Sequence, residues 1–114
     1  MKMHYFISLM ICLLFVATLV AHPASNIKAE FNKETNILTV NFTHQVQEPG
    51  KHFIFESVVS VNKNTIIRQT ISRQETASGG TLVYKMIDIK PGDKVSVAVT
   101  CNKGGKKSTT IEIK

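Results

Sequence analysis

The chain has 114 residues, which is room for one domain of ordinary size and for little else. It carries 14 Lys and Arg against 8 Asp and Glu, so its formal net charge at pH 7 is +6. The basic residues are scattered and no aromatic residues alternate with them, which argues against nucleic acid as a partner.

The segment from Met1 to Ala21 has the composition of an export signal. Its short start is positively charged, an apolar run follows from Tyr5, and the chain turns polar directly after Ala21. Leu19-Val20-Ala21 ends on a small residue and offers a cleavage site. We therefore expect residues 1–21 to be a signal peptide and residues 22–114 to form an exported domain. Without cleavage, the apolar run would instead anchor the same domain to a membrane.

Residues 22–114 show apolar side chains at every second position and no helical periodicity. Turns rich in Gly, Pro, Asn and Asp separate seven such segments, which we predict to be strands. They are Ile27–Phe31, Ile37–Phe42, His52–Val61, Thr65–Ile71, Thr81–Ile89, Lys94–Cys101 and Ser108–Ile113. Short strands at regular spacing, without helices, predict an all-β fold, a seven-stranded antiparallel immunoglobulin-like β-sandwich.

Four residues with metal-ligand chemistry stand at strand ends. After Ala21, the histidines are His22, His44 and His52, and the one cysteine is Cys101. Strand ends gather at the two poles of a sandwich, where loops bring side chains to a common point. Because imidazole nitrogen and thiolate sulfur are ligands for iron, copper and zinc, the pattern predicts one mononuclear metal site.

Cys101 on its own allows several interpretations. A lone cysteine cannot form a disulfide within the domain, so intermolecular pairing, a buried inert thiol and a metal-bound thiolate stay open. In its alternating strand it shares a face with Val95, Val97 and Val99. We therefore expect its thiol to point inward, at the last position of a core-facing row.

The segments around these residues resemble a known family. Thr43–Val46 and Lys51–Ile54 each carry a histidine, Thr100–Asn102 precedes two glycines, and His22 lies 22 residues before His44. This arrangement is similar to the iron domain of superoxide reductase and desulfoferrodoxin. That family has an HPM-type histidine, a second histidine at an H-Y-I strand start, and a C-N-x-H-G loop. The family fold is an immunoglobulin-like sandwich.

The resemblance implies a site and an activity. His22, His44 and His52 would be equatorial ligands of iron, and Cys101 would be the axial thiolate, opposite an open position. At this open position, proteins of the family transfer one electron from ferrous iron to superoxide, which is reduced to peroxide. Gly104 stands where the family has its fourth histidine.

The family also has a glutamate–lysine pair before its first histidine, and Val20-Ala21 stands there in this chain. The lysine of that pair guides superoxide. Lys51 and Lys103 are therefore candidates to supply the missing positive charge.

Other readings remain alongside this one. Three imidazoles and a thiolate also suit zinc or copper. Cleavage after Ala21 would make His22 the first residue, whose α-amino and ring nitrogens would together chelate copper. An alternative from a different functional class is that the domain is an interaction module without metal. For the iron domain, the implied partners are superoxide or another small anion and an electron donor that the sequence does not identify.

Overall fold

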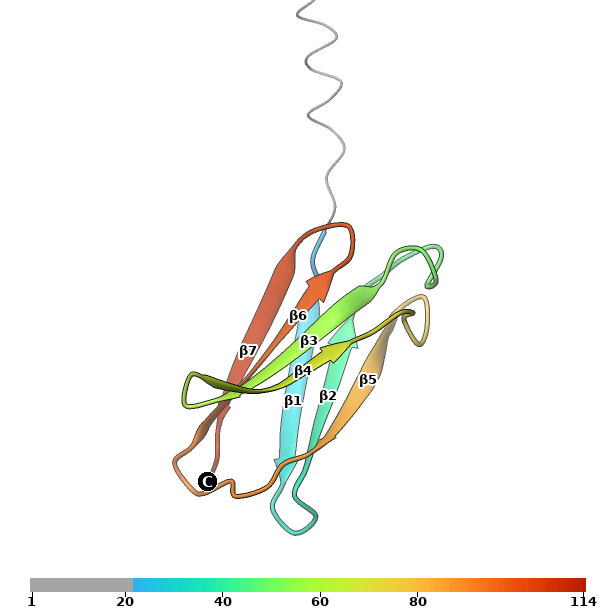
Figure 1. Ribbon diagram of the computed structural model, residues 1–114. Coiled ribbons are helices and arrows are strands. Elements are labelled where there is room, and N and C mark those ends of the chain that lie inside the picture. Colours follow the sequence, from blue (N-terminus) through green and yellow to red (C-terminus); the bar gives the residue numbers. More distant parts are fainter. Residues whose placement is uncertain (1–21) are drawn as a thin grey trace, which may run out of the picture.

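The computed structural model describes residues 22–114, so the predicted signal peptide lies outside the described residues. The described chain forms seven strands (Figure 1). They are β1 (Asn26–Asn32), β2 (Ile37–Thr43), β3 (Ile54–Val61), β4 (Asn64–Thr70), β5 (Gly79–Lys85), β6 (Lys94–Cys101) and β7 (Lys106–Glu112). No helix long and apolar enough to cross a membrane occurs among these residues.

The strands form two antiparallel sheets packed face to face, which confirms the predicted sandwich. One sheet has the order β1-β2-β5 and the other has the order β4-β3-β6-β7. In a constant-type immunoglobulin domain, the fourth strand joins the sheet of the first, second and fifth. Here β4 pairs with β3 instead, because the two-residue turn at Asn62 and Lys63 makes them a tight hairpin.

Alternation along β2 and β6 builds the core between the sheets. Leu38 and Val40 of β2 are fully buried, as are Val95, Val97 and Val99 of β6. Each second residue of a strand points to the same face, so these rows face each other across the sandwich. Cys101 continues the row of β6 and is 1% exposed, which confirms that its thiol points inward.

Most strand boundaries differ from the predicted ones by one or two residues, and two of them have a clear structural consequence. His52 lies in the loop before β3, because the strand begins at Ile54. A bulge between Ile54 and Glu56 inserts one residue into β3, so that Ile54 and Ser57 both point inward although they are three positions apart. β5 ends at Lys85 instead of continuing to Ile89, and Asp88 adopts a positive φ of 66° in the loop that follows.

The loops divide between two poles of the sandwich (Figure 1). One pole carries residues 22–25, which we call the N-terminal arm, together with the loops of residues 44–53, 71–78 and 102–105. We call this end the site pole. The other pole carries the loops after β1, β3 and β5 and the C-terminal residue. The four predicted ligands are therefore all at the same end of the molecule.

Leu38 provides a test of the core that leaves the site pole untouched. Leu38→Ala should lower the free energy of unfolding by about 2–5 kcal/mol, since the fully buried side chain leaves a cavity. Val83 on β5 is 60% exposed, and Val83→Thr should change stability by less than about 0.5 kcal/mol. Urea unfolding of both variants measures the difference. Equal midpoints for the two would contradict the described core.

Candidate metal centre

The pairing of β1 with β2 brings His22 to His44. Asn26 at the start of β1 lies opposite Thr43 at the end of β2. The backbone N–H of Ser25 donates to the carbonyl of Thr43 at 2.8 Å, which continues this pairing into the N-terminal arm. His44 follows β2 directly, and the arm runs past it. Residues 22 positions apart in sequence thus become neighbours.

The pairing of β3 with β6 does the same for His52 and Cys101. Ile54 at the start of β3 lies opposite Cys101, the last residue of β6. Asn102 holds the two loops together, because its side-chain oxygen accepts from Phe53 N–H at 2.9 Å and its amide donates to the carbonyl of Lys51 at 2.9 Å. His52, between those two residues, is therefore fixed against the end of β6.

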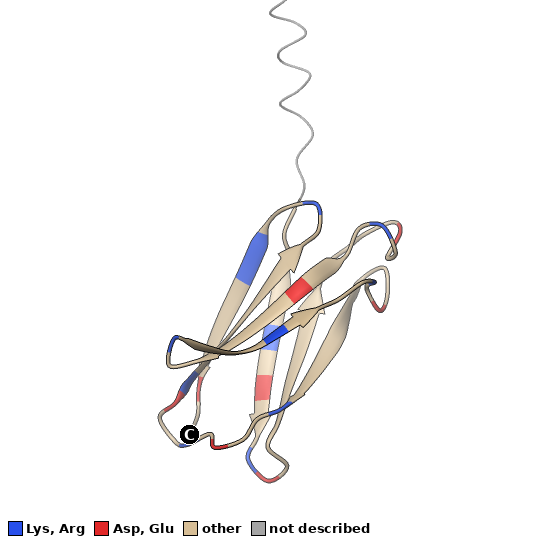
Figure 2. Cartoon of the chain, viewed as in Figure 1, with Lys and Arg blue, Asp and Glu red and all other residues tan. Residues whose placement is uncertain are grey.

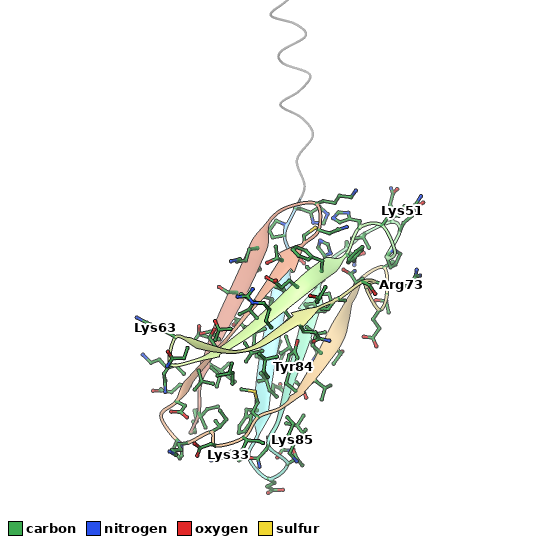
Figure 3. The ribbon with its side chains drawn as sticks, viewed as in Figure 1. Lys33, Lys51, Lys63, Arg73, Tyr84 and Lys85 are labelled. Carbon is green, nitrogen blue, oxygen red and sulfur yellow. The ribbon has the colours of Figure 1, made fainter. Side chains whose placement is uncertain are left out.

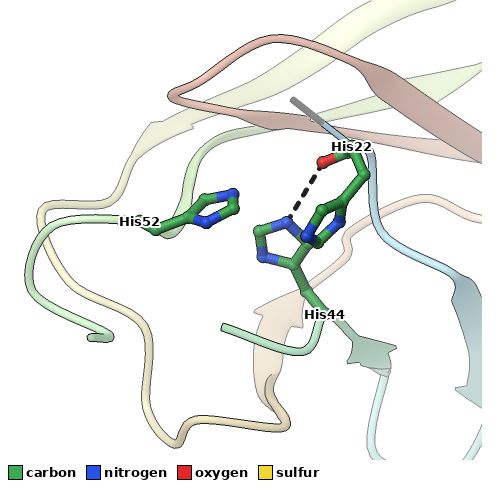
Figure 4. Close-up of side chains that lie close together, drawn as sticks. All are labelled: His22, His44 and His52. Carbon is green, nitrogen blue, oxygen red and sulfur yellow. Dashed lines mark hydrogen bonds between the residues drawn. The ribbon is translucent and has the colours of Figure 1, made fainter. Parts of the chain in front are cut away.

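The three imidazole rings converge on one point (Figure 4). Their centroids are 4.9 to 5.0 Å apart in all three pairs, and one ligand nitrogen from each ring lies within 4.8 Å of the others. His44 is buried, His52 is half-buried and His22 is exposed. The three histidines that the sequence singled out are thus brought together and could hold a metal ion.

Gln74 selects one tautomer of the neutral His44 imidazole. Its side-chain amide donates to the carbonyls of His44 at 2.7 Å and Thr76 at 2.9 Å, so its Oε1 must be the acceptor side. That oxygen accepts from Ile54 N–H at 3.3 Å and lies 2.8 Å from His44 Nδ1. Nδ1 therefore donates to Gln74, so in the neutral imidazole Nε2 keeps its lone pair and could bind a metal.

The other nitrogen of His44 faces a second acceptor. Its Nε2 lies 3.3 Å from the main-chain carbonyl oxygen of His22, the contact drawn in Figure 4. In a neutral His44 protonated on Nδ1, both of these atoms are acceptors and neither carries a hydrogen. A metal ion bound beside these two atoms would make the contact favourable.

Cys101 lies outside the three-histidine group and meets it through His52. Its Sγ is 3.1 Å from His52 Nε2, and the backbone N–H of Lys103 donates to the same sulfur at 3.4 Å. Cys101 is a free, buried cysteine. The sulfur therefore has two polar contacts, one with His52 and one with the backbone of the following loop. Ligation by Cys101 is consistent with this geometry and stays a prediction.

Gly105 makes room for the N-terminal arm. A Cβ at this position would lie 2.8 Å from Pro23 N and 3.0 Å from Pro23 Cδ, and Gly105 has a φ of +95°. A residue with a side chain would both strain the backbone and push the arm away. The glycine pair after Cys101 therefore permits His22 to reach the other two histidines.

The electrostatic environment of His52 favours its neutral form. Its partial burial, followed by the charges of His44, His22 and Lys103, lowers the pKa of His52 below its ordinary value. A metal ligand must present a free lone pair, so this lowering of the pKa favours metal binding.

Comparison with known proteins adds no family to this description. No protein-family model matches the chain, and no curated protein sequence matches it significantly. The resemblance to superoxide reductase thus stays a prediction. The candidate ligand residues were found from the sequence, whereas Gln74 was not, because a glutamine in a polar loop carries no pattern that marks it.

Gly105 yields a prediction about the arm. Gly105→Ala should weaken cobalt(II) binding by roughly tenfold, because the displaced arm moves His22 away from its partners. Gly92→Ala is the matched control, since Gly92 has a similar φ of +92° but nothing within 4 Å of an added Cβ. Competition titrations with a chelator measure both affinities. Equal weakening in the two variants would mean that backbone strain alone is responsible.

Gln74 yields a second prediction. Gln74→Met keeps the length of the side chain but removes the acceptor for His44 Nδ1–H, so cobalt(II) affinity should fall roughly 10–100-fold. Nitrogen-15 NMR of the metal-free protein should show the Nδ1-protonated tautomer of His44 in the wild type and its loss in the variant. Gln69→Met, where the replaced amide accepts from Tyr84 instead, should leave both measurements unchanged.

Proposed function

We propose that residues 22–114 form an exported, mononuclear iron-binding domain that reduces superoxide to peroxide. The observation that carries the proposal is the convergence of His22, His44 and His52 at the site pole, with the Cys101 thiol adjoining His52. Gln74 supports it, because a histidine whose second nitrogen is hydrogen-bonded to a buried amide is oriented as a metal ligand.

The protein's own residues would bind and orient a metal ion, and they would admit a small molecule to it. An iron ion held by these residues would supply one electron to superoxide, which leaves as hydrogen peroxide with two protons, and an external reductant would restore the ferrous ion. His44 is the most rigid donor, because it is buried and held by Gln74. His22 is exposed, so the site is open to a small molecule from solvent on that side.

Metal analysis tests the proposal first. Protein of residues 22–114 loaded anaerobically with ferrous iron should retain close to one iron per chain after desalting, and His44→Ala should retain little. The iron protein should also consume superoxide and form one peroxide for each superoxide removed. Protein that stays metal-free would instead support the interaction module without metal. Iron retained without any superoxide consumption would reject the activity alone.

Cys101 is tested by spectroscopy. Oxidation of the iron protein should produce a visible thiolate-to-iron absorption band, and Cys101→Ser should abolish this band while iron is retained by the three histidines. Ser57→Ala, at another buried position of similar size, should keep the band. A band that survives in Cys101→Ser would refute thiolate ligation.

A further inference from the structure

The main-chain carbonyl of His22 borders the candidate metal centre. Its oxygen is 3.3 Å from Nε2 of His44, and Figure 4 shows it directed at the His44 ring. Within residues 22–114, no backbone N–H, hydroxyl or side-chain amide donates a hydrogen bond to this oxygen. Because Nδ1 of His44 donates to Gln74, Nε2 of the neutral imidazole has no hydrogen to offer it either. A partly buried carbonyl oxygen is thus left with both lone pairs free.

The N-terminal arm holds this oxygen in place. Ala24 is 2% exposed, so the arm is packed into the core directly after the proline. Pro23 lies against Gly105, close enough that a Cβ on Gly105 would be 2.8 Å from Pro23 N. This nitrogen belongs to the same planar peptide group as the carbonyl of His22. The contacts of Pro23 therefore also set the direction of the His22 oxygen.

Proline makes this carbonyl a good electron-pair donor. The bond between His22 and Pro23 is a tertiary amide, because proline carries carbon instead of hydrogen on its backbone nitrogen. The added carbon increases the electron density on the carbonyl oxygen. Backbone carbonyl oxygens are regular metal ligands in proteins, and they keep two lone pairs where no hydrogen bond uses them.

The side chains of the site pole offer no oxygen donor in its place. Among residues 22–114, the group that could hold a metal ion contains histidines and no carboxylate. The acidic residues of the site-pole loops are Glu48 and Glu75 (Figure 2). The carboxylate of Glu48 lies 3.2 Å from the ammonium group of Lys51, at the loop tip labelled in Figure 3. Glu75 accepts from the backbone N–H of Thr81 at 2.9 Å. An oxygen ligand from the described chain would thus come from the backbone.

We propose that the main-chain carbonyl oxygen of His22 is a ligand of the metal ion, so that His22 binds through both its ring and its backbone. This inference rests on the proposed function, since it needs the metal centre, and it adds a donor that is not a side chain. Gly104 and Gly105 bring no side chain to the centre. The carbonyl would add an oxygen to the imidazole and thiolate donors on that side.

Carbon-13 NMR of the cobalt(II) protein tests the ligand directly. His22–Pro23 is the one His–Pro pair in the chain, so carbon-13 in the histidine carbonyls together with nitrogen-15 in proline marks the carbonyl of His22 alone. This carbon should show a large through-bond hyperfine shift once cobalt(II) is bound. The carbonyl carbons of His44 and His52 carry the same carbon-13 label and are internal controls. Their shifts should be smaller, because these residues bind through their rings only.

His22→Ala separates the oxygen from the ring. The variant keeps a carbonyl bonded to Pro23, and carbon-13 alanine with nitrogen-15 proline again marks a single pair. Loss of the imidazole should weaken cobalt(II) binding, but at saturating cobalt(II) the carbonyl carbon at position 22 should keep its through-bond shift. Gly105→Ala, which displaces the arm, should abolish the shift, and Gly92→Ala is the matched control that should retain it.

The outcomes distinguish the two proposals. Cobalt(II) bound by the wild type, with the His22 carbonyl carbon moving no more than a through-space shift at its position requires, would overturn carbonyl ligation and leave the three-histidine site standing. Loss of the shift in His22→Ala while cobalt(II) stays bound would overturn it as well. A wild-type protein that takes up neither cobalt(II) nor iron overturns the proposed function and this inference together, and metal analysis detects this before any spectrum is recorded.

Discussion

Antiparallel pairing is the constraint on which the site depends. In an antiparallel pair the start of one strand lies beside the end of its partner. In the pairs β1–β2 and β3–β6, the strand ends next to the histidines and the cysteine therefore lie side by side at the site pole. The two pairs belong to different sheets. The site is therefore assembled across the sandwich, and its geometry follows from how the sheets pack.

Gln74 orients the ring of His44, one of the three candidate ligands. Histidine placed near other histidines has two nitrogens and two neutral tautomers. The buried amide of Gln74 selects one of the two tautomers of His44. Its nitrogen donates to two carbonyls, so its oxygen must be the acceptor that faces His44 Nδ1. A polar network buried at this position costs desolvation, and complete satisfaction of its hydrogen bonds offsets that cost. The same network joins the loops of residues 44–53 and 71–78, so one set of hydrogen bonds both links these loops and orients the His44 ring.

Cys101 belongs to the core and to the site at once. Along β6 it is the last member of the row that includes Val95, Val97 and Val99, and its sulfur also contacts His52. The backbone N–H of Lys103, in the loop that follows β6, points at the same sulfur. Packing thus fixes where the sulfur lies, and the loop that follows supplies a polar contact to it.

The sequence by itself determined the strand content and the ligand candidates of this protein. Period-two alternation is local, so it predicted seven strands and the inward direction of Cys101, and the scarcity of histidine and cysteine singled out four residues. The bulge at Ile54–Glu56 was not predictable, because an extra residue in one strand is defined only against its partner. Tertiary structure alone decided the hydrogen bonds of Gln74, the place of β4 beside β3, and the contact between His52 and Cys101. The physical reason is the same in each case: hydrogen bonds and ion pairs form between groups that folding brings together, and no local pattern records them.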